Sequence, residues 1–225
     1  MNEPVLLPIF PLRTVLLPGA FLPLHIFEPR YLQMVRECSA SRAPFGVSLI
    51  ARGEEVGGPA LPHFVGTSAR ITLLERRPDG TLNLLSVGER RFRIDSLVVE
   101  SVTPYLVGEV HWLPEGSAEP PRYAELEAAV RELFVGYATL VRQLAPDWEP
   151  PVIPGDLSPS ELSYRVAAVL PVEHGRLQDL LEAPTAASRL RRERELLQTE
   201  TRTLRQALRQ RRDNGPSGLY RPSIN

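Results

Sequence analysis

The sequence predicts an α+β protein in which a strand-rich half, with about six strands and one helix, precedes a helical half. From residue 5 to about 113 apolar residues mostly alternate with polar ones, whereas from Tyr123 onward they recur every three or four residues. The first half lacks the repeated strand–helix units of a parallel sheet, so its strands suit a small closed or partly closed barrel. We therefore expect domains at 1–118 and 119–212, with a mobile tail over 213–225.

Prolines interrupt the apolar N-terminal segment, at positions 8, 11, 18, 23 and 29. Since proline cannot continue a helix or sit in a central strand, this segment should form short extended pieces joined by sharp corners. Residues 28–41 break the strand pattern. Their apolar positions lie three or four apart and predict a short amphipathic helix: Tyr31, Leu32, Val35 and Cys38.

The following strands are separated by recognisable turn residues. Gly53–Pro62 is rich in Gly and Pro and is expected to be a loop, and Pro78-Asp79-Gly80 has the residues of a hairpin turn. The alternating segments around these turns are expected to be strands: 45–50, 66–75, 81–87, 91–95 and 106–112.

The second half should contain four helices, separated by prolines. A long amphipathic helix is expected over 123–144, and Ser158-Pro159-Ser160-Glu161 has the form of a capping box that opens a second helix, ended by Pro171. A third helix is expected over 172–182. The last should begin after Thr185 and run to about residue 212, which is roughly 42 Å at 1.5 Å per residue.

Several of these segments resemble, in order and at matching spacing, the N-terminal substrate-binding domain family of Lon proteases over essentially residues 5–212. The segments that carry the resemblance are Leu7-Pro8-Ile9-Phe10-Pro11-Leu12, Phe45-Gly46-Val47, Val65-Gly66-Thr67-Ser68-Ala69-Arg70-Ile71, Pro78-Asp79-Gly80-Thr81, Gly88-Glu89-Arg90-Arg91-Phe92-Arg93-Ile94 and Leu180-Leu181-Glu182. The resemblance implies a PUA-like pseudo-barrel of six strands with one helix, then a C-terminal helical bundle, used to hold polypeptides. It further implies a free-standing member of the family, without ATPase or protease domains.

Composition excludes the chemistry of those two domains. All 26 basic residues are Arg, so the chain has neither the Lys of a phosphate-binding Walker loop nor that of a Ser-Lys dyad. One Cys and four scattered His give no spacing typical of a metal site, and no nucleophile motif occurs. We expect no catalytic residue, no cofactor and no metal.

Two groups of residues are candidates for binding. Phe21, Phe27, Glu28, Arg30 and Tyr31 are predicted to border a polypeptide-binding surface. Alternatively, Glu28 stabilises the N-terminus of the helix that follows it, and Arg30 forms a local ion pair.

On the last helix, Arg191, Arg192 and Arg194 form a possible face for an acidic partner. The leucine stripe of that helix is expected to pack on the preceding helices or on a second copy of the chain, as a homodimer.

The favoured function is a non-enzymatic, ATP-independent polypeptide-binding module, adaptor-like or chaperone-like, which acts on unfolded or apolar segments and works with a separate protease or ATPase in trans. The alternative is RNA binding by the barrel and the basic last helix. A formal net charge of −1 and the acidic block at 115–182 disfavour nucleic acid. We expect a cytoplasmic protein without a membrane segment.

Overall fold

The computed structural model describes residues 3–58, 60–98, 102–115 and 123–213. It forms two compact units. The strand unit contains the residues up to Pro114 and also His174–Glu182, whereas the helical unit contains Glu115–Glu173 and the chain from Ala183 onward. The predicted boundary at 118 and the predicted tail beyond Asp213 lie outside the described residues.

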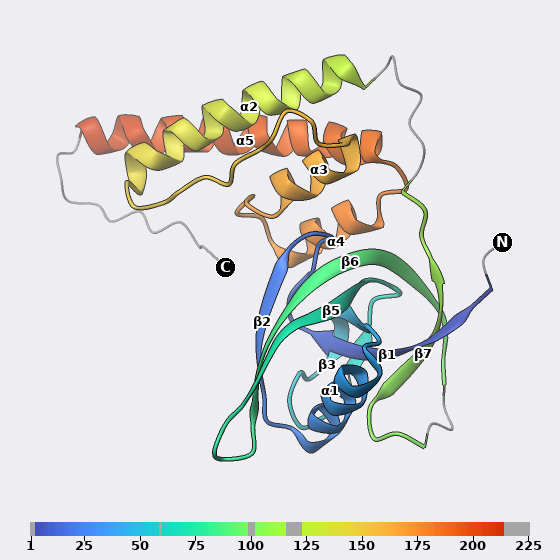
Figure 1. The fold of residues 1–225 in the computed structure, drawn as a ribbon. Coiled ribbons are helices and arrows are strands. Elements are labelled where there is room, and N and C mark those ends of the chain that lie inside the picture. The colour runs from blue at the N-terminus through green and yellow to red at the C-terminus, as the bar shows by residue number, and fades with distance from the viewer. Residues whose placement is uncertain (1–2, 59, 99–101, 116–122, 214–225) are drawn as a thin grey trace. The chain divides into compact units, whose positions relative to one another are not determined.

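The strand unit is built on a sheet of seven strands, most of which pair antiparallel, and Figure 1 shows how the sheet curves around α1 (Pro29–Ser41). They are β1 (Val5–Leu12), β2 (Phe21–Ile26), β3 (Phe45–Gly53), β4 (Ala60–Pro62), β5 (Val65–Arg76), β6 (Leu82–Leu97) and β7 (Leu106–Trp112). Pairing runs β1-β7-β6-β5-β3, and β1 also pairs in parallel with β3, so these five strands close a ring. Outside the ring, β2 pairs with β6 and β4 with β3.

Strand number and length differ from the prediction in two places. The expected strands 81–87 and 91–95 are one continuous strand, β6, because Gly88 pairs with Ala69 and carries the ladder across the gap. Strand β4 lies within the stretch expected to be a loop, where three residues pair with the end of β3.

Two apolar clusters fill the strand unit. In the first, α1 (Pro29–Ser41) buries Tyr31, Met34 and Val35 against β1 and its neighbours, which confirms the helix predicted at 28–41. The second surrounds Phe92, which is fully buried. Its ring requires glycine beside it, since a Cβ on Gly66 would lie 2.5 Å from the Phe92 ring.

Helix α4 (His174–Glu182) belongs to the strand unit, although its sequence neighbours are helices. The buried amide of Gln178 donates to the Val65 carbonyl at 2.9 Å. Arg91 on β6 is 1% exposed, and its guanidinium donates to the carbonyls of Leu181 at 2.7 Å and Pro114 at 3.3 Å. The domain predicted at 119–212 assigned this helix to the helical half, whereas these contacts hold it on the strands.

The helical unit contains α2 (Ala124–Leu144), α3 (Pro159–Ala167) and α5 (Ala186–Asp213), with α2 and α5 side by side (Figure 1). The predicted capping box is confirmed, since the Ser158 hydroxyl accepts from the Glu161 N–H and the Glu161 carboxylate accepts from the Ser158 N–H. The leucine stripe of α5 is buried against α2 and α3. The predicted homodimer through this helix stays a prediction.

A buried polar cluster lies inside the helical unit. Arg189 is fully buried, pairs with Glu115 at 2.8 Å and donates to the Ser163 hydroxyl at 3.0 Å. Ser163 in turn donates to Glu193, also fully buried, whose Oε2 has no hydrogen-bond partner. Burial raises the pKa of Glu193 to about 8, against the opposing effects of Ser163 and Arg189.

We predict that Arg91→Met lowers the free energy of unfolding of the strand unit by about 2 to 4 kcal/mol, because two carbonyls lose a charged donor. The measurement is urea denaturation followed by Trp112 fluorescence in a Trp148→Phe background, since the chain's two tryptophans lie in different units. Arg93→Met is the control, because Arg93 is exposed on the same strand. Equal effects of the two substitutions would contradict the role given to Arg91.

The buried Glu193 predicts a pH dependence of the helical unit. Its pKa is raised in the folded state, so its contribution is fully present below about pH 4.5 and is lost as the pH rises toward about 8. Between pH 5 and pH 8 the loss should be on the order of 3 kcal/mol, at 1.36 kcal/mol per pKa unit.

Glu193→Gln should remove this slope, whereas Glu195→Gln, at an exposed position of the same helix, should retain it. Trp148 fluorescence in a Trp112→Phe background reports the unfolding. A wild-type slope that persists in Glu193→Gln would show that another group causes it.

Candidate functional site

The five residues predicted to bind polypeptide lie together in sequence but play different parts in the structure. Phe27 and Phe21 are 51% and 67% exposed, whereas Tyr31 is 4% exposed. Phe27, Glu28 and Tyr31 line a small hollow of about 90 Å³, together with residues of β1, β2 and the loop between β3 and β4. Phe21 lines neither this hollow nor the larger one described below.

Tyr31 forms part of the wall of the small hollow. Its ring stacks on Phe10 with centroids 3.9 Å apart, and burial raises the pKa of its hydroxyl. The side chain is therefore fixed and apolar in character, and only part of it faces the hollow.

Glu28 and Arg30 hold the loop that follows β3. The Glu28 carboxylate accepts from the Gly57 N–H at 3.3 Å and makes no side-chain cap to α1. Arg30 pairs with Glu28 at 3.0 Å, donates to the Gly58 carbonyl at 3.3 Å and covers the Tyr31 ring at 4.6 Å. The local ion pair considered for Arg30 thus forms, and both residues keep Val56, 56% exposed, beside the small hollow.

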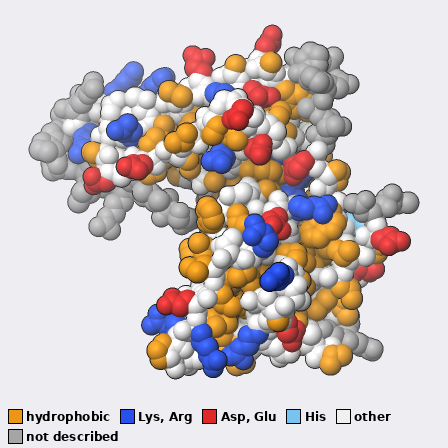
Figure 2. Space-filling model, viewed as in Figure 1, with side chains coloured by type: hydrophobic (Ala, Val, Ile, Leu, Met, Phe, Trp, Pro, Cys, Tyr) orange, Lys and Arg blue, Asp and Glu red, His pale blue; other side chains and the backbone are white. Residues whose placement is uncertain are grey.

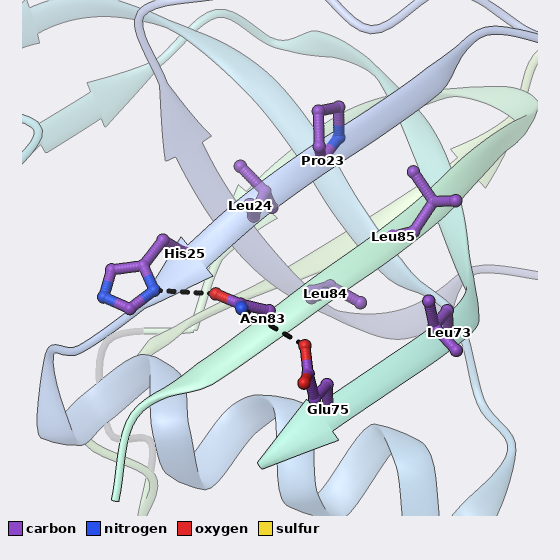
Figure 3. A pocket seen from close by; sticks show the side chains of 8 residues that line it. All are labelled: Pro23, Leu24, His25, Leu73, Glu75, Asn83, Leu84 and Leu85. Atoms are coloured by element: carbon purple, nitrogen blue, oxygen red, sulfur yellow. Dashed lines mark hydrogen bonds between the residues drawn. The ribbon is translucent and has the colours of Figure 1, made fainter. Parts of the chain in front are cut away.

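A larger hollow of about 350 Å³ lies on the outer face of β2, β6 and β5 (Figure 3). The register places residues of the three strands in rows across this face. One row is apolar, Pro23, Leu85 and Leu73, and the next is polar, His25, Asn83 and Glu75. A third row, Phe21, Val87 and Arg70, lies beyond the apolar one. We call these three strands the ribbon.

A bulge in β5 explains why Leu73 faces outward. The register with β6 shifts between Ile71 and Leu73, so these two residues lie on opposite faces of the strand. Ile71 packs against the core, whereas Leu73 is 62% exposed. Simple alternation would have placed Leu73 inside with Ile71, so the sequence pattern did not identify it.

His25 and Leu24 line both hollows, so the small hollow and the ribbon form one continuous surface. In the space-filling view, hydrophobic side chains gather across the visible face of the strand unit, with arginines among them (Figure 2). The sequence predicts Phe21 and Phe27, which are both exposed in the structure, but it predicts no residue of β5 or β6 on this surface. Only the alternation Phe21-Pro23-His25 in β2 indicated an outward face.

The three arginines of α5 that were predicted to face an acidic partner differ in exposure. Arg191 and Arg192 are exposed and Arg194 is partly buried, while the neighbouring Arg189 is the buried partner of Glu115. Arginine side chains gather over the C-terminal half of α5 (Figure 2), which includes Arg202, Arg205, Arg209 and Arg211.

Within the described residues, no three His, Cys, Asp or Glu side chains are grouped so that they could hold a metal ion. The Cys38 thiol is buried, and burial raises its pKa to about 11, so it is a poor nucleophile at neutral pH. No described helix combines the length and hydropathy needed to cross a bilayer.

Comparison with known sequences gives a match to one family. Residues 6–199 match the family described as the ATP-dependent protease La (LON) substrate-binding domain. The chain is 34% identical over 114 residues to a Lon protease of Flavobacterium johnsoniae, covering 50% of this chain and 14% of that protein. It is 26% identical over 210 residues to Lon protease 1 of Herpetosiphon aurantiacus, and this match covers 90% of this chain and 25% of that protein. The chain therefore spans a quarter or less of the length of these relatives.

Two solved structures share the fold. A Lon N-terminal domain protein from Xanthomonas campestris superposes with a TM-score of 0.61 and 33% identity, covering 84% of this chain and 96% of that one. The N-terminal domain of a Mycobacterium avium complex Lon protease superposes with a TM-score of 0.64, covering 86% of this chain and 98% of that one. Because the identity is 22%, this second likeness supports the fold alone.

We predict that Arg30→Leu releases the loop after β3. Glutamyl endopeptidase should then cleave after Glu54 or Glu55 about five- to thirtyfold faster, since the loop loses contacts that together contribute about 1 to 2 kcal/mol. Arg36→Leu, at an exposed position of the same helix, is the control and should leave the rate unchanged. Equal cleavage rates in wild type and Arg30→Leu would show that Arg30 does not hold the loop.

Proposed function

The chain belongs to the ATP-dependent protease La (LON) substrate-binding domain family, and from that premise we propose that it binds unfolded polypeptide segments without catalysing a reaction. The observation that carries the proposal is the continuous surface of the ribbon and the small hollow. It exposes Phe21, Leu73 and Phe27 by 67%, 62% and 51%. An apolar surface of this kind, next to two hollows, is typical of an interaction site.

The chemistry of the surface favours capture of side chains over addition of a strand. Strand β2 pairs only with β6 among the described strands, so its other edge is open. Pro23 lies in the middle of β2 and has no N–H to donate, which interrupts the hydrogen bonds that an added strand would need. A bound segment would therefore be held mainly through apolar side chains resting on the ribbon.

Such binding should be weak and tolerant of sequence. Removal of apolar surface from water stabilises a complex by about 25 cal/mol per Å², but ordering an unfolded segment offsets much of that gain. Affinity in the micromolar range or weaker suits a module that handles many different clients.

We infer further that the strand unit is a PUA-like pseudo-barrel, which the closed ring of five strands supports, and that the helical unit is a bundle. The module is proposed to act as an adaptor or chaperone in the cytoplasm and to pass bound polypeptide to an ATPase and protease on a separate chain. With no Lys among its 225 residues, the sequence cannot supply a Walker lysine or a Ser-Lys dyad itself.

We predict that Leu73→Ser and Phe21→Ser, in the full chain, each weaken binding of a permanently unfolded protein about fivefold or more, because each removes exposed apolar contact area. A reduced and carboxymethylated protein is a suitable probe, with affinity measured by fluorescence anisotropy. Leu6→Ser is the matched control, since Leu6 is 68% exposed on β1, outside both hollows.

The RNA-binding alternative rests on the barrel and the basic residues of α5, and it is tested in the same assay. Labelled RNA at two salt concentrations serves as competitor, because binding through phosphates weakens steeply with salt. The proposed surface is wrong if Leu73→Ser has no effect while binding is abolished by the joint replacement of Arg191, Arg192 and Arg194 with Ala.

A further inference from the structure

The polar row of the ribbon has a defined hydrogen-bond direction. A carboxylate only accepts hydrogen bonds, so the contact of 3.3 Å between Asn83 Nδ2 and Glu75 Oε2 assigns the amide nitrogen of Asn83 to the Glu75 side. Its Oδ1 then faces His25 Nδ1 at 2.9 Å and must accept from it (Figure 3). With the proton of a neutral imidazole on Nδ1, His25 Nε2 is an acceptor.

The row therefore ends in acceptors on both sides. His25 Nε2 lies at one end and the Glu75 carboxylate at the other, and the Asn83 amide between them is hydrogen-bonded to both residues. Both terminal residues are exposed, so a bound segment can reach them. A group that complements such a row must carry several N–H donors.

The charge on this face is unbalanced at one point. Arg70, in the third row, forms an ion pair with Glu89, so their charges cancel. Glu75 forms no ion pair with any of the described residues. This carboxylate, which has no ion-pair partner among the described residues, lies beside the apolar row, two residues along the strand from Leu73.

We propose, on the basis of the polypeptide-binding function inferred above, that the ribbon prefers extended segments in which an apolar side chain and an arginine lie two residues apart. The apolar side chain rests in the larger hollow against Pro23, Leu85 and Leu73, and the guanidinium lies over the row of His25, Asn83 and Glu75.

The spacing follows from the geometry of extended chains. Neighbouring rows on one face of a strand are separated by two residues, or about 6.6 to 6.8 Å, and alternate side chains of an extended peptide have the same period. A planar guanidinium has five N–H donors in a fixed arrangement and so satisfies separated acceptors better than a lysine ammonium does. Either chain direction meets the requirement, because the rows fix a spacing and not a polarity.

The test is an NMR titration of the full chain with short peptides of Ser and Gly that carry Phe-Ser-Arg, Arg-Ser-Phe, Phe-Ser-Glu or Ala-Ser-Arg. The side-chain amide signals of Asn83 report binding at the row. At low salt, Phe-Ser-Arg or Arg-Ser-Phe should bind about three- to tenfold more tightly than Phe-Ser-Glu, in the range of an exposed ion pair with added hydrogen bonds. Ala-Ser-Arg should bind at least fivefold more weakly than its Phe counterpart.

Substitutions that change the charge of Glu75 distinguish the preference for arginine from the binding of the apolar side chain. Glu75→Gln should bring the Arg and Glu peptides to within twofold of each other, and Glu75→Arg should reverse their order. Glu132→Gln, which makes the same change of net charge as Glu75→Gln at an exposed position of α2, should leave the preference intact.

If wild type binds the Arg and Glu peptides equally while Leu73→Ser still abolishes binding, the preference is refuted and the polypeptide-binding surface stands. If Leu73→Ser leaves binding of the Phe peptides unchanged, or if no Phe peptide binds, the surface is wrong and the preference falls with it.

Discussion

Strand β6 is the constraint on which the strand unit depends, because its sixteen residues pair with three other strands. Its first half lies between β2 and β5 and forms the ribbon, whose outer face stays open. Its second half pairs with β7 and completes the closed ring. Gly88 lies where the two halves meet, and a Cβ there would lie 2.4 Å from the Leu17 carbonyl oxygen. One strand therefore links a rigid core to an exposed surface.

The two faces of β6 are used differently in its second half. Phe92 enters the apolar core, whereas Arg91 is buried beside it and donates to carbonyls of Leu181 and Pro114. A buried guanidinium is costly to desolvate, so its hydrogen bonds to these carbonyls are what make its burial possible. Because Leu181 lies in α4, the strand unit is assembled from segments far apart in sequence, and the chain passes between the units three times.

The proposed binding surface combines fixed and exposed parts. The small hollow is held in place by the hydrogen bonds of Glu28 and Arg30 to the loop after β3 and by the stacking of Tyr31 on Phe10. The ribbon adds exposed side chains, notably Leu73 and Glu75, and Glu75 forms no ion pair with the described residues. A surface that is already ordered loses less entropy on binding, which matters most when the client is an unfolded chain.

The order and type of the elements, the capping box at Ser158 and the family followed from the sequence, because periodicity, caps and turns are local properties. Phe21 and Phe27 were predicted as binding residues from local pattern too, as apolar residues in a segment broken by prolines, and both are exposed in the structure. Tertiary structure alone decided the rest. A one-residue bulge turned Leu73 outward, pairing across three strands aligned His25 with Asn83 and Glu75, and long-range hydrogen bonds placed α4 on the strands. Each of these depends on register or on contacts between distant residues, and neither leaves a trace in the periodicity of a single segment.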